Sequence, residues 1–307
     1  MRNNRLNVLS ICELCPRMCK VDRSKSVGFC GASDKVKIAL VSLHKWEEPC
    51  LIGEHGAGTI FFACCNLRCV FCQNHDISQL QHGIEVTIER LAEIFLEQQA
   101  RGAANIELVT PTHYVPQIIE ALDIAKLRGL ALPVVYNTNA YDTIETIEML
   151  RGYIDIFLPD LKYYDDELAY HYSSAPKYFE IASAAIEKMV DLTGRVTFDN
   201  CGQLRRGVIV RHLILPNHRH DSMKVVEWLY KTFGDDIYIS LMNQYTPMFK
   251  VLDSAQYKKL NRRLTTFEYD SVINYAVELG LKNCYMQVGK TASTDFVPVF
   301  DGSGVLG

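Results

Sequence analysis

The sequence lacks any long apolar run and any excess of basic residues. No stretch is long and apolar enough to span a bilayer, and the opening MRNNRLNVLS has no apolar segment of the length a secretory signal needs. We therefore expect a cytoplasmic protein with no membrane partner. Lysine and arginine total 32 against 36 aspartates and glutamates, which gives a net charge of −4. Since nucleic-acid partners held through phosphates require a basic surface, we expect no nucleic-acid partner either.

The chain also lacks internal repeats, low-complexity tracts and Gly/Ser-rich linkers. Its 307 residues suit one large domain, or one domain with an appendage. We predict a cysteine-rich amino-terminal segment with a hairpin over residues 1–50, a core over 51–300 and a short tail over 301–307.

Cysteine is scarce in most of the chain but crowded at its start. Nine of the eleven cysteines lie in the first 72 residues, and only Cys201 and Cys284 follow. In a reducing compartment such a group is more typical of metal ligands or reactive thiols than of a disulfide framework. The sequence therefore places the chemistry near the amino terminus and predicts scaffold plus a binding site after it.

Apolar periodicity after residue 58 alternates between strand and helix. Regular alternation favours a parallel α/β sheet with right-handed crossovers, although periodicity does not show whether the sheet closes as a barrel. A strand or hairpin is expected over 36–48, and the segment 193–206 is the best candidate for a long functional loop. The predicted strands are 59–63, 105–110, 133–138, 154–160, 207–215, 237–242 and 284–288, and the predicted helices are 87–102, 115–129, 143–152, 180–192, 223–233 and 267–279.

Polar residues follow the end of nearly every predicted strand. Because sites in parallel α/β folds gather at the carboxyl ends of the strands, these residues should face one another. The groups concerned are Gln73 and Asn74, 110–113, 137–139, Asp160 and Lys162, 211–218, and 243–245.

The run FFACCNLRCVFCQ contains Cys65, Cys69 and Cys72 in the spacing C-x3-C-x2-C. Three thiolates on a short loop suit an iron–sulfur cluster or another soft metal. Three ligands for four irons would leave one iron open to a substrate or cofactor. Cys64 could be a fourth ligand, but adjacent cysteines in an extended chain point in different directions. The alternatives are a zinc knuckle and cysteines that only pack.

The spacing C-x3-C-x-φ-C after the first strand of an α/β chain resembles the radical S-adenosylmethionine (SAM) superfamily. The surrounding CNLRCVFCQN is similar to the pyruvate formate-lyase activating enzyme group, especially its larger activating enzyme-like branch, and the resemblance runs from about Gly58 to Phe300. It implies a partial (β/α)6 TIM-like barrel with a small Cys-rich segment, an oxidoreductase with a [4Fe–4S] cluster and SAM as cofactors, and formation of a 5′-deoxyadenosyl radical that abstracts hydrogen.

The resemblance also implies SAM contacts at the ends of the second and third core strands. Thr110, Thr112 and His113 stand where the family has a glycine-rich segment, and this departure leaves the contacting atoms uncertain. Asn137 and Asn139 stand where activating enzymes have a similar Asn-rich turn. A lone histidine is more often a hydrogen-bonded structural residue, so we assign no catalytic role to His113.

Three more residues match the family at the fourth and fifth core strands. Asp160 and Lys162 resemble its D-x-K and would serve the SAM carboxylate, its ribose or a nearby cation. Arg211 is similar to a fifth-strand arginine that reaches SAM. The alternative for Asp160 and Lys162 is a surface ion pair of little energetic value, and for Arg211 a structural partner inside the sheet.

A second cysteine group, Cys12, Cys15, Cys19 and Cys30, has the spacing C-x2-C-x3-C-x10-C. Four thiols in a polar segment favour a closed site, for which tetrahedral zinc is the simplest ligand. A second [4Fe–4S] cluster that relays electrons is the rival interpretation. Unligated thiols are the third, although little else would order this segment.

The target of the radical rests on resemblance alone, since a fold does not fix a function. By resemblance the partner is a glycyl-radical protein, whose glycine α-carbon would lose a hydrogen atom. The alternatives are radical modification of a small metabolite or peptide, and a non-catalytic iron–sulfur electron-transfer protein. An electron donor such as flavodoxin or ferredoxin is a further expected partner.

Overall fold

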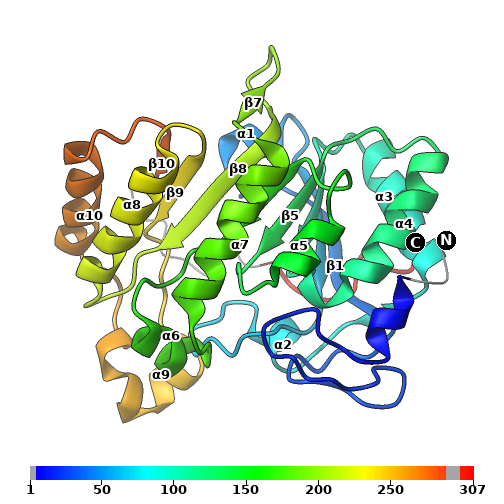
Figure 1. The fold of residues 1–307 in the computed structure, drawn as a ribbon, viewed down its shortest axis with the longest axis horizontal. Helices are drawn as coiled ribbons and strands as arrows, with labels where there is room; N and C mark the ends of the chain where they lie inside the picture. Colours follow the sequence, from blue (N-terminus) through cyan, green and yellow to red (C-terminus); the bar gives the residue numbers. More distant parts are fainter. Residues whose placement is uncertain (1–4, 288–297) are drawn as a thin grey trace.

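The computed structural model describes residues 5–287 and 298–307, and these form one curved α/β sheet with helices on its outer side (Figure 1). The strands are β1 Val36–His44, β2 Ala57–Phe62, β3 Ile84–Val86, β4 Ile106–Val109, β5 Val134–Thr138, β6 Ile156–Pro159, β7 Thr197–Phe198, β8 Leu204–Leu213, β9 Tyr238–Met242 and β10 Cys284–Met286. The helices are α1 Pro49–Ile52, α2 His75–Ser78, α3 Ile88–Ala100, α4 Val115–Leu127, α5 Ile144–Met149, α6 Asp166–Ser173, α7 Tyr178–Thr193, α8 Arg219–Phe233, α9 Lys250–Asp253 and α10 Thr266–Glu278, with 3-10 turns η2 Leu6–Leu9, η3 Thr112–Tyr114 and η4 Ala255–Leu260.

The predicted parallel sheet is confirmed, and it is open. Seven strands pair in parallel, in the order β2, β4, β5, β6, β8, β9 and β10. Between each strand and the next, the chain passes through at least one helix. The path ends at β10 on one side and β3 on the other, so the described strands form a partial rather than a closed barrel. Residue 288 of the last predicted strand lies outside the described residues.

The apolar character of the strands explains the packing. Strands β2, β4, β5 and β6 are buried along their whole length, as expected for parallel strands that are covered on both faces. Helix starts also follow the sequence: the Thr87 side chain accepts a hydrogen bond from the Arg90 amide and so caps α3 as predicted. In the described chain, no helix combines the length and the apolar character needed to cross a membrane.

Residues 36–48 form one strand and a following segment, so the hairpin alternative was wrong. Strand β1 pairs antiparallel with β2, and His44 at its end lies opposite Ala57 at the start of β2. The beginning of β1 also pairs antiparallel with β3, a short strand that was not predicted from the sequence. Because β1 runs against β2, the residues after His44 lie at the opposite end of the sheet from the cysteine run that follows β2.

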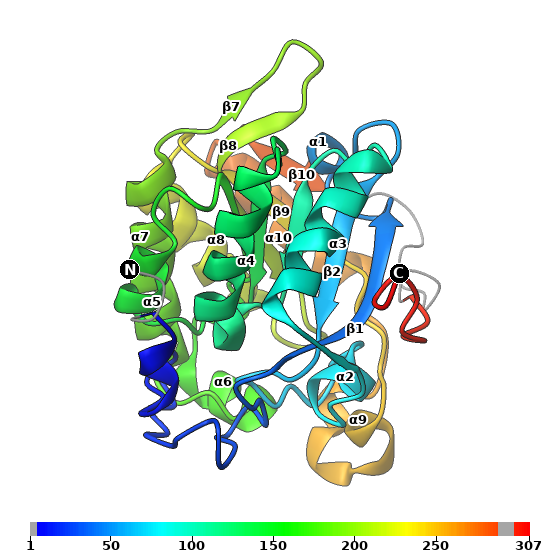
Figure 2. The same cartoon turned by 90° about the vertical axis from the view of Figure 1, so that its right-hand side faces the viewer.

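The segment 193–206 is not a loop at the polar strand ends, which corrects the prediction. Strand β7 pairs antiparallel with the beginning of β8, and the hairpin projects from the end of the sheet where β8 starts (Figures 1 and 2). The Asp199 carboxylate accepts hydrogen bonds from the amides of Cys201 and Gln203 at 2.8 and 3.0 Å, which closes the turn locally. The cysteine loop lies at the other end of the molecule, beside α2 and α6 (Figure 2).

The carboxyl-terminal residues 301–307 pack on the edge of the sheet. The Gly302 amide donates to the Ala39 carbonyl, and the Val41 amide donates to the Ser303 carbonyl, both at 3.0 Å. Val305 is fully buried. This short segment therefore covers β1 instead of leaving its surface exposed.

Candidate functional site

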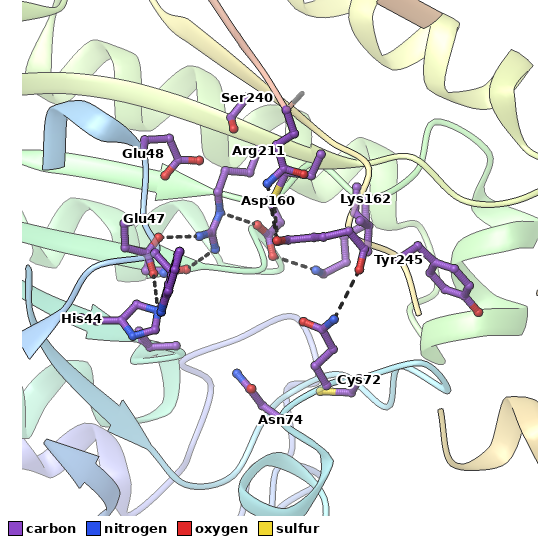
Figure 3. Close-up of a pocket in the computed structure, with 18 of the residues that line it drawn as sticks. His44, Glu47, Glu48, Cys72, Asn74, Asp160, Lys162, Arg211, Ser240 and Tyr245 are labelled. Carbon is purple, nitrogen blue, oxygen red and sulfur yellow. Dashed lines mark hydrogen bonds and ion pairs between the residues drawn. The ribbon is translucent and has the colours of Figure 1, made fainter. Parts of the chain in front are cut away.

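One cavity of about 450 Å³ lies inside the curve of the sheet (Figure 3). Cys69 and Cys72 border it on one side, and the segment that follows β1 borders it on another. Asp160, Lys162 and Arg211 also line it. The polar residues predicted at the ends of β2, β6 and β8 are therefore brought to one cavity.

The cysteine loop is fixed by backbone hydrogen bonds to its surroundings. The Cys64 amide donates to the Ile77 carbonyl at 2.8 Å, so the loop closes on α2. The amides of Arg68 and Val70 donate to the last residues of α6, at 3.0 and 2.9 Å. Cys64 has a φ of 77°, a left-handed conformation that turns the chain sharply where β2 ends. The loop is consequently held in shape before any ligand binds.

Polar hydrogens are directed at the three loop sulfurs. The Ser173 hydroxyl donates to the Cys69 Sγ at 3.0 Å, and the Asn139 amide lies 3.5 Å from the Cys65 Sγ. The Cys72 Sγ lies 3.3 Å from the Ser78 hydroxyl. Such donors stabilise thiolates, and around metal centres they tune the ligand sulfurs.

Burial works against ionisation of the same thiols. Burial and, to a smaller extent, the neighbouring Cys69 together raise the pKa of Cys65 to about 12 and that of Cys72 to about 11. The three thiols are thus close enough to interact electrostatically. Metal binding at this loop must displace protons, because a thiolate and not a thiol is the ligand.

The residues fit a [4Fe–4S] cluster by the chemistry of the donor set. Three thiols come from one loop, hydroxyl and amide groups point at them, and the loop borders a cavity in which an open iron could meet a ligand. Over residues 5–287 and 298–307, no three His, Cys, Asp or Glu side chains enclose a position for a single metal ion.

A chain of alternating charges crosses the cavity. The Arg211 guanidinium donates to Glu47 at 3.1 Å and to Asp160 at 3.0 Å, and the Lys162 ammonium donates to Asp160 at 2.7 Å (Figure 3). The Asn137 side-chain oxygen accepts the third Arg211 bond at 2.6 Å. Three of the five N–H hydrogens of Arg211 and one of the three ammonium hydrogens of Lys162 thus have these acceptors, which leaves both side chains with hydrogens for another ligand.

Burial and pairing set the pKa values along this chain. Burial would raise the pKa of Asp160, but Lys162 and Arg211 outweigh it and hold that pKa below its usual value. Burial raises the pKa of Glu47 well above its usual value, and the nearby Glu107 raises it further. The Asp160–Lys162 pair is only about one-fifth exposed at each side chain, so it is not the surface ion pair considered above.

Three of the predicted SAM-binding residues lie behind the cavity wall. Thr112 is buried in a hydroxyl network in which the Tyr136 hydroxyl donates to Thr112 at 3.3 Å. His113 is buried, with its Nε2 2.8 Å from the Ala63 carbonyl, and burial lowers its pKa to about 3. Thr110 has a φ of 58° and directs the chain from β4 into the next turn. These positions match structural roles, and their contact with SAM stays a prediction.

The two predicted asparagines have different positions. Asn137 lines the cavity and donates to Glu107 at 2.7 Å, in addition to accepting from Arg211. Asn139 donates to the Asn66 side chain at 2.8 Å and so anchors the cysteine loop. Asn137 is therefore placed for a ligand, and Asn139 supports the thiols.

The acidic residues after β1 were missed by sequence reasoning. Glu47 and Glu48 both line the cavity, and Glu107 lies next to them with a hydrogen bond from Thr59 at 2.8 Å. The predicted site residues come from the carboxyl ends of the parallel strands, whereas these glutamates follow the antiparallel β1 or lie inside β4. The available signal was the pair of glutamates in HKWEEP directly after an apolar strand, and one glutamate inside the otherwise apolar β4.

The four amino-terminal cysteines form a second group outside the cavity. Burial raises the pKa of Cys15 to about 12, with further contributions from Cys30, Cys12 and Cys19, so the four thiols lie near one another. The Phe29 amide lies 3.3 Å from the Cys19 Sγ. The ligand type suits zinc or a second cluster, but in the described residues the four sulfurs do not enclose a position for an ion, and the metal stays a prediction.

The amino-terminal segment is docked directly on the cysteine loop. The Arg17 side chain donates to the Asn66 carbonyl at 2.9 Å and to the Ser174 carbonyl at 2.6 Å. Burial raises the pKa of Cys64 to about 11, with an additional contribution from Cys30. Adjacent residues of the chain therefore serve different groups: Cys64 neighbours Cys30, and Cys65 neighbours Cys69.

Comparison with known proteins identifies the family. The model of the radical SAM superfamily matches residues 59–227, more than half of the chain. An uncharacterized protein of Methanocaldococcus jannaschii, MJ0674, is 30% identical over 292 residues, which is 91% of this chain and 78% of that protein.

Similar solved structures have low sequence identity to this chain. The [FeFe]-hydrogenase maturase HydG is similar with a TM-score of 0.50 at 13% identity, covering 74% of this chain and 50% of that one. Streptococcus suis SuiB bound to its precursor peptide SuiA has a TM-score of 0.49 at 14% identity, covering 74% and 47%. This chain thus spans about half the length of each solved structure. It belongs to the radical SAM superfamily, whose enzymes use a [4Fe–4S] cluster and SAM.

Proposed function

We propose that this protein cleaves SAM reductively and directs the resulting radical at a hydrogen atom of a substrate. The observation that carries the proposal is the position of Cys65, Cys69 and Cys72 on one preformed loop at the edge of a charged cavity. When bound, a [4Fe–4S] cluster supplies the electron that breaks the sulfonium carbon–sulfur bond of SAM and yields a 5′-deoxyadenosyl radical.

The protein's own residues position the reactants in this proposal. Lys162 would hold the SAM carboxylate with its remaining ammonium hydrogens, and Asp160 would accept from the ribose or the amino group. Phe71 and Val109 line the cavity beside them and would exclude water from a reactive radical. Arg211 would hold Asp160 in place, because its guanidinium donates to that carboxylate as well as to Glu47 and Asn137.

For the amino-terminal cysteines we propose a zinc ion that folds the segment onto the cysteine loop. A second [4Fe–4S] cluster relaying electrons is the competing proposal, and the docking through Arg17 would suit it as well, since that contact brings the two cysteine groups together. A flavodoxin or ferredoxin is the electron donor we propose in either case.

Two classes of target follow from two different observations. The motif CNLRCVFCQN resembles activating enzymes, which favours the glycine α-carbon of a partner protein. The acid-lined cavity of about 450 Å³ favours a small metabolite or peptide held inside the barrel. The two are distinguished by whether added small molecules or an added protein raise the yield of 5′-deoxyadenosine.

The first test is metal and sulfide analysis of anaerobically purified protein, with electron paramagnetic resonance of the reduced sample before and after adding SAM. About four irons with zinc, a spectrum changed by SAM and release of 5′-deoxyadenosine with dithionite would support the proposal. About eight irons without zinc would assign a second cluster to the amino-terminal cysteines. A spectrum indifferent to SAM would leave an electron carrier.

A further inference from the structure

Two glutamates line the end of the cavity opposite the cysteine loop, and a third is buried near them. The antiparallel direction of β1 brings Glu47 and Glu48 to the side where β2 begins, and the buried Glu107 on β4 accepts hydrogen bonds from Asn137 and Thr59 close to Glu47. Their carboxyl groups are close enough to interact: burial raises the pKa of Glu47 and of Glu107, and Glu48 contributes to both increases. We call these three residues the acidic floor.

Glu48 lines the cavity and has a buried carboxylate oxygen without a partner in the described part of the chain. Its side chain is 8% exposed, and its Oε2 has no hydrogen-bond partner among the residues that the structure describes. Glu48 stands at the N-cap of α1, but its side chain does not cap that helix. Burying a carboxylate oxygen without a partner is unfavourable. The local structure therefore gives no account of this side chain's position, whereas a bound ligand would.

The positive charge near the floor does not match its acidic groups. Arg211 is the cation bonded to Glu47, and the same guanidinium is shared with Asp160. Lys162 is paired with Asp160, on the side toward Cys69 and Cys72. Among the residues that the structure describes, Glu47 is the one member of the acidic floor that is bonded to Arg211, and the only other basic group beside it is the His44 Nε2 at 4.0 Å. A ligand bearing positive charge would balance the three carboxyl groups, and an anionic ligand would be repelled.

The position of the floor separates it from a cofactor bound at the cysteines. In Figure 3, Glu48 and Cys72 lie on opposite sides of the cavity, with Arg211 and Asp160 between them. Strand β2, Ala57–Phe62, begins on the side of Glu48 and ends at the cysteine loop. Its six residues, at about 3.3 Å each, cover roughly 17–20 Å. A ligand of the open iron would contact the cysteine side, so Glu48 faces whatever occupies the space beyond it.

We propose that the acidic floor binds a cationic nitrogen group of the substrate, a primary ammonium or a guanidinium, with Glu48 as its direct acceptor. The inference rests on the proposed function, because it names the substrate class for the same cavity. The cationic group would anchor one end of the substrate at Glu48. The carbon–hydrogen bonds at the other end of the substrate would then face the cysteine side of the cavity. Free amines and the side chain of a peptide lysine or arginine share this chemistry.

The test measures binding to the full-length, anaerobically reconstituted protein saturated with S-adenosylhomocysteine, which permits no turnover. Isothermal titration calorimetry would compare butylammonium and butylguanidinium with neutral 1-butanol, and N-acetyl-lysine methylamide would represent the peptide-borne form. We expect the cations to bind at least about tenfold more tightly than the alcohol, and Glu48→Gln to remove that preference. Glu54→Gln is the matched control, since Glu54 is an exposed glutamate just after α1. A Glu48→Asp variant should retain part of the preference if Glu48→Gln fails to fold.

The outcomes separate this inference from the proposed function. Equal binding of cations and alcohol, or cation binding unchanged by Glu48→Gln, would overturn the cationic site while SAM cleavage in the wild type stands. Loss of S-adenosylhomocysteine affinity in Glu48→Gln, without cation binding, would assign Glu48 to the cofactor instead. If the protein binds the cations but cannot cleave SAM, the cationic site is supported and the proposed function is contradicted. Preference for the lysine derivative over butylammonium would favour a peptide as the source.

Discussion

The two cysteine groups of this protein contain the same ligand type but lie in different surroundings. Cys65, Cys69 and Cys72 border the cavity, beside Lys162 and below a chain of buried charges. Cys12, Cys15, Cys19 and Cys30 lie outside the cavity, and the thiols of Cys15 and Cys30 interact electrostatically with those of Cys12 and Cys19. Three thiols beside a cavity leave a position for a ligand, whereas four thiols close together leave none.

This difference shows that the spacing of the cysteines in the sequence indicates metal binding. The position of each cysteine group in the fold indicates what the bound metal can do. Both groups would be recognised from sequence as metal-binding, and burial raises the pKa of Cys15 in one group and of Cys65 in the other. Only the cavity group has access to groups that could hold a second molecule. The predictions below act first on one cysteine group, then on the other, and then on their surroundings.

The largest effect is expected from Cys69→Ala. Removing one of three ligands should eliminate SAM cleavage and reduce the iron content by about four per chain, while the amino-terminal metal remains. Iron analysis and a 5′-deoxyadenosine assay measure both results. Cys201→Ala is the control, because Cys201 is exposed on the β7–β8 hairpin. Intact SAM cleavage in Cys69→Ala would contradict the assignment.

Cys15→Ser should act on the other group. If zinc is bound there, the variant loses it, and the amino-terminal segment loses a stabilisation that is on the order of 10 kcal/mol for structural zinc in small peptides. Limited proteolysis should then cut within residues 5–35, and the iron content should stay unchanged. A loss of about four irons would instead show that this group holds a cluster.

Arg211→Ala should affect the cavity and spare both cysteine groups. The substitution leaves Glu47 and Asp160 without their shared guanidinium, and removing one partner of a buried ion pair costs about 3–5 kcal/mol. SAM affinity should fall because Asp160 is no longer held in place, while iron content stays near the wild-type value. Denaturant unfolding and SAM titration separate the two effects, and an unchanged SAM affinity would remove Arg211 from the site.

The smallest effect concerns His113, which connects the two cysteine groups. Its Nε2 bonds the Ala63 carbonyl before the cysteine loop, and its own carbonyl accepts a hydrogen bond from Arg23 of the amino-terminal segment. Burial lowers its pKa to about 3, from about 6.5 in the unfolded chain. A depressed pKa contributes stability above pH 6.5 that is lost as the pH falls toward 3.

Between pH 7 and pH 5 this histidine should reduce the free energy of unfolding by about 2 kcal/mol. His113→Gln keeps a hydrogen-bond donor and should flatten that part of the pH profile, as measured by urea unfolding at both values. His212, whose pKa burial lowers to about 4, remains and should preserve the rest of the acid sensitivity. A profile identical to the wild type would show that His113 does not titrate in this range.

The sequence predicted most of the sheet because parallel strands need long apolar runs and helices need apolar stripes at their own spacing. Strands β2, β4, β5 and β6 lie within a residue or two of their predicted bounds. Strand β3 was missed because it is short and partly exposed. The 193–206 segment was misassigned because a turn stabilised by Asp199 and a functional loop have similar polar composition.

The sequence by itself determined the radical SAM family and the two cysteine groups, since ligand type and spacing are local properties of the chain. It also determined which strands are buried, through their composition. Only the tertiary structure decided that Arg211, Asp160 and Glu47 are bonded, because these residues come from separate elements. It also decided that Glu48 faces the cavity, because that follows from the antiparallel pairing of β1 with β2, a long-range choice that no local pattern encodes.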